Sequence, residues 1–251
     1  MKISEKRPPK ADLIITAGPT ATRQALEWAE GPPVMAALIT RSAFQALRTN
    51  AQPNKYPPTA LYLDQPLARQ VAFINKLLPS SVFEARHLFS LVSPPQSELL
   101  SALQKASLSG GFKFSGEVVT HSDQVVAMTE HLLSQKNGIF LALPDNAVFT
   151  RDNIRPFLLT TYRYRAPVIA FSIPFAQAGA LASLHATPAQ MGQELGQWIL
   201  KLPPSATHAL PAPREAAQFS VFINTQVARS LKLNVPSEGE LVSALNNLGD
   251  K

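Results

Sequence analysis

The sequence predicts an α/β protein with two lobes, each built on a parallel sheet that is flanked by helices. Short apolar runs alternate with helix-forming segments, and small or polar residues follow the apolar runs. Proline-rich stretches at 48–59 and 202–217 interrupt this alternation twice. Parallel strands need helical crossovers, and their carboxyl-end loops line clefts. The strand, turn and helix pattern is clearest at 12–26, 34–42, 87–97 and 138–146.

The amino-terminal elements follow from this pattern. An apolar strand at 12–17 leads into Gly18, Pro19 and Thr20, which open a helix that reaches Leu26. Proline suits a first helical turn, and threonine is a common N-cap. A second strand and helix begin at 34–42, and the loop at 48–59 has neither a helical nor a strand period.

The middle of the chain continues as a regular series. A short strand at 61–63 precedes a helix over 65–78, whose apolar residues recur at helical spacing until Pro79 ends it. The remaining predicted elements are strand 87–92, helix 96–107, strand 112–119, helix 122–135, strand 138–143, helix 151–162, strand 167–171, helix 188–200 and a strand with a helix over 219–231. The linker at 202–217 is predicted to be an extended crossing without an element of its own.

These boundaries predict the domain organisation. A first, partial lobe comprises 1–62 and about 178–217, and a second lobe comprises 63–177. The sequence leaves open to which lobe the strand and helix of 218–251 belong.

Composition narrows the class of protein. A hydrophobic content of 45% in 251 residues is enough for real cores. No apolar run approaches the roughly 20 residues of a membrane-spanning helix. The amino end, MKISEKRPPK, lacks the apolar core of a secretory signal, so the chain is either cytoplasmic or exported with its signal removed. The absence of cysteine excludes disulfides, thiolate metal sites and cysteine nucleophiles.

A net charge of +6 raises the question of nucleic-acid binding. The basic residues are scattered, and the local cluster of Arg155, Arg163 and Arg165 is interpreted as a solvated helix face. No nucleic-acid partner is therefore predicted.

Motifs for catalysis are missing. The five histidines are dispersed without HExxH spacing, and the sequence holds no GxSxG, P-loop or GxGxxG motif. We therefore predict no enzyme, no metal site and no cofactor.

Five segments together carry a resemblance to a known family. They are DLIITAGPTATRQAL at 12–26, LDQPLARQVAFINKLLP at 63–79, LPDNAVF at 143–149, APVIAFSIPFAQAGALASL at 166–184 and FSVFINTQVARSLKLNVP at 219–236. In this order they resemble ABC-transporter substrate-binding proteins related to the tryptophan- and tyrosine-type uptake components, with a class I periplasmic-binding-protein fold. The resemblance implies two lobes that close over an amino-acid-like or carboxylate ligand. It also implies a periplasmic or exported protein and, as its partner, an ABC-transporter permease or another membrane receptor.

The chain departs from this family in two places. Relatives begin with further strands and helices before the segment that opens this chain, a deficit of roughly 50–60 residues at 30 or more per strand–helix–strand unit. The strand at 13–17 is then expected at an exposed sheet edge that favours self-association. Where many relatives carry an Asp-Pro pair, this chain has Arg41 within Thr40-Arg41-Ser42, which favours an anionic ligand over an amine.

Candidate ligand-binding residues lie after predicted strands in both lobes, and each has a structural alternative. Thr20 and Thr22 either present donors to a ligand or form an ordinary first turn capped by Thr20. Asp145 and Asn146 either face the ligand or cap a turn, and capping alone explains Ser93. Phe175 is explained as well by core packing as by a ligand wall. The full set is Thr20, Thr22, Arg41, Ser42, Ser93, Gln96, Asp145, Asn146, Phe175 and Gln177.

Two other functions remain open at this stage. A sensory or partner-docking domain could keep the fold without an ordered pocket. The effector domain of a transcription regulator shares the two-lobed architecture, but no helix-turn-helix segment precedes Asp12.

Overall fold

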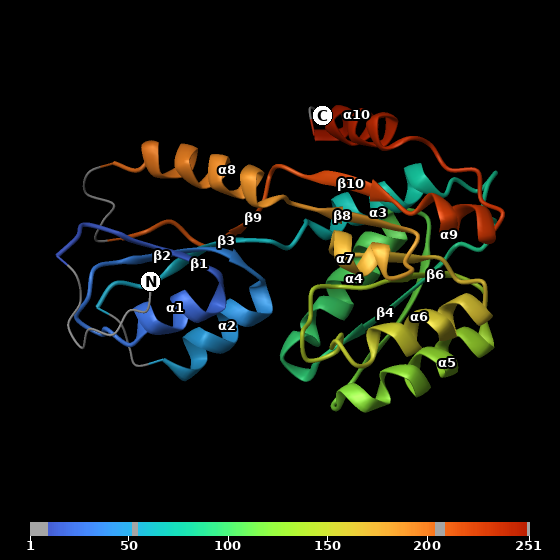
Figure 1. Ribbon diagram of the computed structural model, residues 1–251, viewed down its shortest axis with the longest axis horizontal. Helices are drawn as coiled ribbons and strands as arrows, with labels where there is room; N and C mark the ends of the chain where they lie inside the picture. Colours follow the sequence, from blue (N-terminus) through green and yellow to red (C-terminus); the bar gives the residue numbers. More distant parts are fainter. Residues whose placement is uncertain (1–9, 52–54, 204–208, 250–251) are drawn as a thin grey trace. The chain divides into compact units, whose positions relative to one another are not determined.

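The computed structural model describes residues 10–51, 55–203 and 209–249. Two parallel-rich sheets organise these residues, so the predicted α/β class is confirmed (Figure 1). The predicted loop positions at Pro53 and Pro204 lie outside the described residues.

The chain divides into two compact units. Unit 1 comprises Met1–Gln65 and Ala186–Phe219, and unit 2 comprises Pro66–His185 and Ser220–Lys251. The predicted boundary near 178 is wrong, because the strand at 182–185 pairs within the sheet of unit 2. The same sheet takes the strand that follows Phe219, which assigns the carboxyl-terminal segment to unit 2.

Unit 1 is a four-stranded sheet of order β1-β2-β3-β9, parallel throughout. Its strands are β1 (Ile14–Ala17), β2 (Val34–Ile39), β3 (Thr59–Tyr62) and β9 (Arg214–Glu215). Its helices are α1 (Gly18–Leu26), α2 (Arg41–Asn50) and α8 (Pro188–Leu200). Helices α1 and α2 cover one face of the sheet and α8 covers the other (Figure 1).

Strand β1 is an edge of this sheet among the described strands, as the sequence predicts. Ile15 is 52% exposed, whereas Leu13 and Ile14 are partly buried against the helices. The apolar surface of this edge is therefore carried mainly by Ile15.

Unit 2 is a six-stranded sheet of order β10-β8-β7-β6-β4-β5, in which only the β10–β8 pair is antiparallel within the described residues. Its strands are β4 (His87–Val92), β5 (Lys113–Val118), β6 (Ile139–Leu141), β7 (Val168–Ala170), β8 (Ala182–His185) and β10 (Ser220–Ile223). Its helices are α3 (Leu67–Leu77), η1 (Pro94–Gln96), α4 (Glu98–Ser109), η2 (Ser122–Gln124), α5 (Val125–Gln135), α6 (Ile154–Arg163), α7 (Ile173–Gln177), α9 (Thr225–Ser230) and α10 (Glu238–Gly249).

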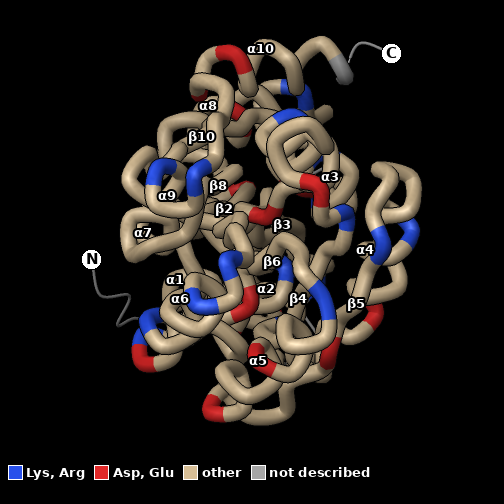
Figure 2. Tube along the Cα trace, turned by 90° about the vertical axis from the view of Figure 1, so that its right-hand side faces the viewer, with Lys and Arg blue, Asp and Glu red and all other residues tan. Residues whose placement is uncertain are grey.

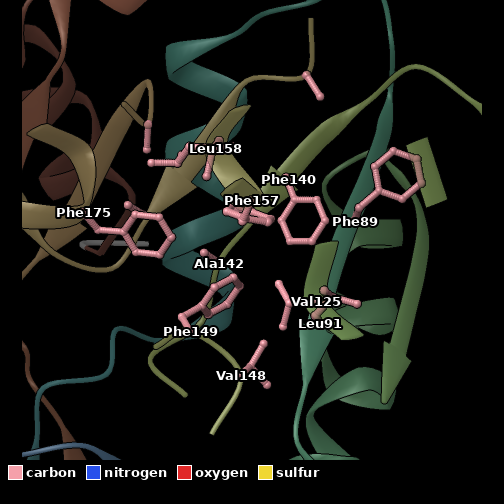
Figure 3. Packing of buried hydrophobic residues seen from close by; sticks show 14 of the residues in the cluster. Phe89, Leu91, Val125, Phe140, Ala142, Val148, Phe149, Phe157, Leu158 and Phe175 are labelled. Atoms are coloured by element: carbon pink, nitrogen blue, oxygen red, sulfur yellow. The ribbon is translucent and has the colours of Figure 1, made fainter. Parts of the chain in front are cut away.

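Aromatic side chains form the centre of the core of unit 2. Phe157 of α6 is fully buried and packs edge-to-face on Phe140 of β6, with ring centroids 4.9 Å apart. Phe149 and Phe175 extend the same cluster toward the ends of β6 and β7 (Figure 3). The loops after these strands are therefore anchored to the core by rings.

Strands β8 and β9 and helices α7 and α10 were not predicted from the sequence. Strand β9 lies in the predicted linker and pairs with β3 at Leu61 and Arg214. Helix α10 packs against α3, and it buries Leu241 and Leu245, which lie one turn apart. The prediction that 202–217 holds no element is thus wrong at Arg214–Glu215, because pairing with β3 makes this segment a strand.

Candidate functional site

A cavity of about 610 Å³ opens at the carboxyl ends of β6 and β7 in unit 2. Parallel α/β sheets bind ligands at this edge, because the strand-to-helix loops converge there. The residues that line it are Asn146, Phe149, Arg151, Ile154, Arg155, Phe171, Ser172, Pro174, Phe175 and Ala178.

Three phenylalanine rings form one wall of this cavity. Phe149 lies 6.3 Å from Phe171 and 5.5 Å from Phe175 between ring centroids, and Phe171 meets Phe175 edge-to-face at 5.4 Å. Phe149 and Phe175 are nearly buried, while Phe171 is partly exposed. The wall is thus rigidly supported by the core but offers an apolar surface to solvent.

The loop after β6 is held by buried polar side chains. Asp145 is 1% exposed, and its carboxylate accepts the backbone N–H of Ser93 at 2.8 Å and that of Ala147 at 3.1 Å. Asn153 accepts the N–H of Thr150 and donates to the carbonyl of Val148. These bonds favour the capping alternative for Asp145 and leave the neighbouring Asn146 exposed at the cavity.

Two arginines line the cavity, Arg151 and Arg155, and both are exposed. In the described chain neither guanidinium has an ion pair, in contrast to Arg41, Arg163 and Arg214. Basic and acidic residues are otherwise dispersed along the trace (Figure 2). Neither arginine is among the ligand contacts predicted from the sequence, which places Arg155 on a solvated helix face, although both follow closely on the Asp145-Asn146 pair.

The other predicted residues of unit 2 are arranged as follows. Ser93 is 4% exposed and precedes η1 without a side-chain capping bond, so the predicted capping role of its hydroxyl is wrong. Gln96 is 4% exposed, and its Nε2 has no hydrogen-bond partner among the described residues. Gln177 is exposed at the end of α7, whereas Phe175 belongs to both the core and the cavity wall.

The predicted residues at the end of β1 in unit 1 do not act together. Thr22 is fully buried, donates to the carbonyl of Gly18 at 2.8 Å and shares a hydrogen bond with Thr16. This hydroxyl is therefore committed to the turn and is not available to a ligand. Thr20 is exposed, and it does not cap α1, because the helix begins earlier, at Gly18, after an extended Ala17.

Arg41 lies at the end of β2, as predicted, but it is not a free cation. Its guanidinium forms an ion pair with Glu215 of β9 and lies over the ring of Tyr62, 5.4 Å from the centroid. Ser42 shares a hydrogen bond with Thr40, which caps α2. A ligand anion would have to compete with Glu215 for Arg41.

Asp64, which is not among the residues predicted from the sequence, is a buried carboxylate next to Arg41. It is 8% exposed, and its carboxylate accepts the backbone N–H of Arg41 at 2.8 Å. Burial raises the pKa of Asp64 from 3.8 to about 6, since desolvation outweighs the N–H bond and positive charge of Arg41.

We expect Asp64 to make unit 1 less stable as the pH rises. A folded-state pKa above the unfolded value means that the folded state binds the proton more tightly, so stability falls between pH 3.8 and about 6. The loss is on the order of 3 kcal/mol. Asp64→Asn should remove it, so that the variant gains stability relative to the wild type over this interval. Both tryptophans, Trp28 and Trp198, belong to unit 1, and their fluorescence during urea unfolding measures the difference.

The exposed Asp12→Asn is the matched control, because it removes the same charge in unit 1 without changing a buried group. A stability difference between wild type and Asp64→Asn that does not vary from pH 4 to pH 7 would contradict the expectation.

The described residues contain no group of three or more histidine, cysteine, aspartate or glutamate side chains that could hold a metal ion. Within the same residues, no helix combines the length and the apolar content that a membrane crossing needs.

Comparison with solved structures identifies the fold. A conserved domain protein from Vibrio cholerae O1 biovar El Tor superposes with a TM-score of 0.66 at 17% identity, covering 94% of this chain and 77% of that chain. The ABC domain from Streptococcus pneumonia in complex with L-Trp gives 0.64 at 15% identity, covering 94% and 78%. A ligand-free, open substrate binding protein with adhesive properties from Clostridium difficile gives 0.61 at 14% identity, covering 91% and 76%.

Sequence comparison gives the family. No curated protein matches the sequence. Residues 6–246, however, match the family described as ABC transporter substrate binding protein. With nearly the whole chain matched and the fold shared, the protein belongs to the ABC transporter substrate binding protein family.

Proposed function

We propose that the protein is the non-enzymatic solute-binding component of an ABC-type uptake system. The observation that carries the proposal is the family match over residues 6–246, supported by a cavity at the ligand-binding edge of the unit 2 sheet. The proposed ligand is a small organic molecule of the amino-acid or carboxylate type. Binding is expected to close the two units, because a ligand shifts the population toward the state that it contacts best.

The proposal includes a location and a partner. A protein of this function acts outside the cytoplasmic membrane, so we propose a periplasmic or exported protein that delivers its solute to an ABC-transporter permease. Three of the predicted residues, Thr20, Asn146 and Gln177, are exposed in the described chain, which supports ligand contact there.

Thermal unfolding of the full chain in the presence of amino acids, organic acids and sugars tests the function. A solute that binds only the folded state increases the free energy of unfolding, by about 2.7 kcal/mol when its concentration is a hundred times its dissociation constant. The unfolding temperature rises accordingly. Small-angle scattering with that solute then reports closure as a smaller radius of gyration. Failure of every solute would favour the alternative, a sensory or partner-docking domain with the same fold.

Self-association through the edge of β1 stays a prediction. Charged residues and proline keep sheet edges from pairing. Strand β1 has neither, and it carries the exposed Ile15. Ile15→Lys should therefore reduce any dimer seen by light scattering across a concentration series. A wild-type protein that is monomeric at all concentrations would contradict the prediction.

A further inference from the structure

The charge of the unit 2 cavity has one sign. Among its lining residues Arg151 and Arg155 are the charged ones, and no acidic side chain lines it. Asp145 directly precedes the lining residue Asn146, but its carboxylate is buried and already accepts two backbone N–H groups. Asp152 follows Arg151 but is exposed and does not line the cavity. The cavity is therefore lined by two basic residues and by no free carboxylate.

The rest of the lining is mostly apolar. Phe149, Phe171 and Phe175 supply ring faces and edges, to which Ile154, Pro174 and Ala178 add aliphatic surface. Such a surface favours a ring or another compact apolar group over a polyhydroxylated solute, whose hydroxyls would lose their hydrogen bonds to water. Guanidinium groups suit carboxylates, since two parallel N–H donors match the two oxygens.

We propose that this cavity selects an organic acid with an apolar ring, bound by Arg151 and Arg155 at its carboxylate and by the phenylalanine wall at its ring. The inference rests on the proposed function and narrows its ligand class. In this proposal the ligand anion is bound by Arg151 and Arg155, which have no ion pair in the described chain. Arg41, the arginine predicted from the sequence, is paired with Glu215. The proposal also means that unit 2 requires no ammonium group on the ligand, because the cavity offers no free carboxylate to bind one.

Three probes of matched size separate these contributions: 3-phenylpropionate, its uncharged amide 3-phenylpropanamide, and phenylalanine, which adds an ammonium group. Isothermal titration calorimetry of the full chain should show 3-phenylpropionate binding at least as tightly as phenylalanine. The amide should bind about tenfold or more weakly, because it lacks the charge that the arginines recognise.

Two variants and a control link the result to the residues. Arg151→Gln combined with Arg155→Gln should weaken 3-phenylpropionate by about tenfold or more and leave the amide unchanged. Phe171→Ala should weaken both probes together, and circular dichroism of the variant checks that it remains folded. The control is Arg229→Gln, which removes an exposed positive charge from α9, outside the cavity, and should leave all affinities within about twofold.

The outcomes distinguish this inference from the proposed function. Equal affinity for acid and amide, or full affinity in the double variant, overturns the inference while solute binding itself stands. The same holds if sugars or other solutes bind and none of the three probes does. If no solute of any class binds the full chain, the proposed function fails together with the inference.

Discussion

Phe157→Ala is expected to destabilise unit 2 by about 3–5 kcal/mol, the usual cost of removing a large buried aromatic side chain. Phe157 is fully buried and contacts three other rings, those of Phe140, Phe149 and Phe175. The cavity left behind cannot be filled by its neighbours, because their rings are already fixed against one another (Figure 3). Urea unfolding followed by far-UV circular dichroism measures the loss.

The neighbouring Leu159→Ala serves as the control, since Leu159 lies on the same helix but is 61% exposed. It should change stability by no more than about 0.5 kcal/mol. A Phe157→Ala loss below about 1 kcal/mol would contradict the packing described for this core.

The second large effect is expected at Asp145. Asp145→Ala removes the acceptor of two backbone N–H groups, and that of Ser93 is buried. Hydrogen bonds to a charged group contribute roughly 1.5–3 kcal/mol each, so the loss of both bonds is expected to cost about 3–6 kcal/mol. Asp145→Asn should lose part of this, because its amide retains one acceptor oxygen.

The exposed Asp123→Asn removes the same charge from unit 2 without these bonds and should leave stability unchanged. The comparison also tests the role of Asp145. A stable Asp145→Asn variant that fails to bind a solute would restore the interpretation of Asp145 as a ligand contact.

The sequence predicts most elements of unit 2 because its strands and helices alternate at regular spacing. In unit 1 the predicted helix over 188–200 agrees residue for residue with α8, where Thr187 forms a capping box with Gln190. The strand at 182–185 was not predicted, because GALASL has no apolar alternation that indicates a strand. Its two neighbours, β7 and β10, come from opposite directions along the chain.

The candidate site was predictable only in part, because pairing decides which residues are free. The position of Arg41 after a strand is visible in the sequence, but its partner Glu215 is 174 residues away. The opposite error concerns Arg155, which the sequence predicts on a solvated helix face but which lies in the first turn of α6 and lines the cavity. Local patterns identify strand ends, whereas side-chain availability depends on long-range contacts that no local pattern contains.

The late pairing of β9 with β3 has a consequence for synthesis on the ribosome. Strand β3 ends at Tyr62, but its neighbour begins at Arg214, and α8, which covers one sheet face, also comes from this distant segment. During translation the first three strands therefore emerge with Met35 and Leu61 uncovered until the segment from Ala186 onward has been made. Contacts of such long sequence separation form slowly, and exposed apolar strands aggregate. Completion of the unit 1 sheet is thus expected to be a late step of folding.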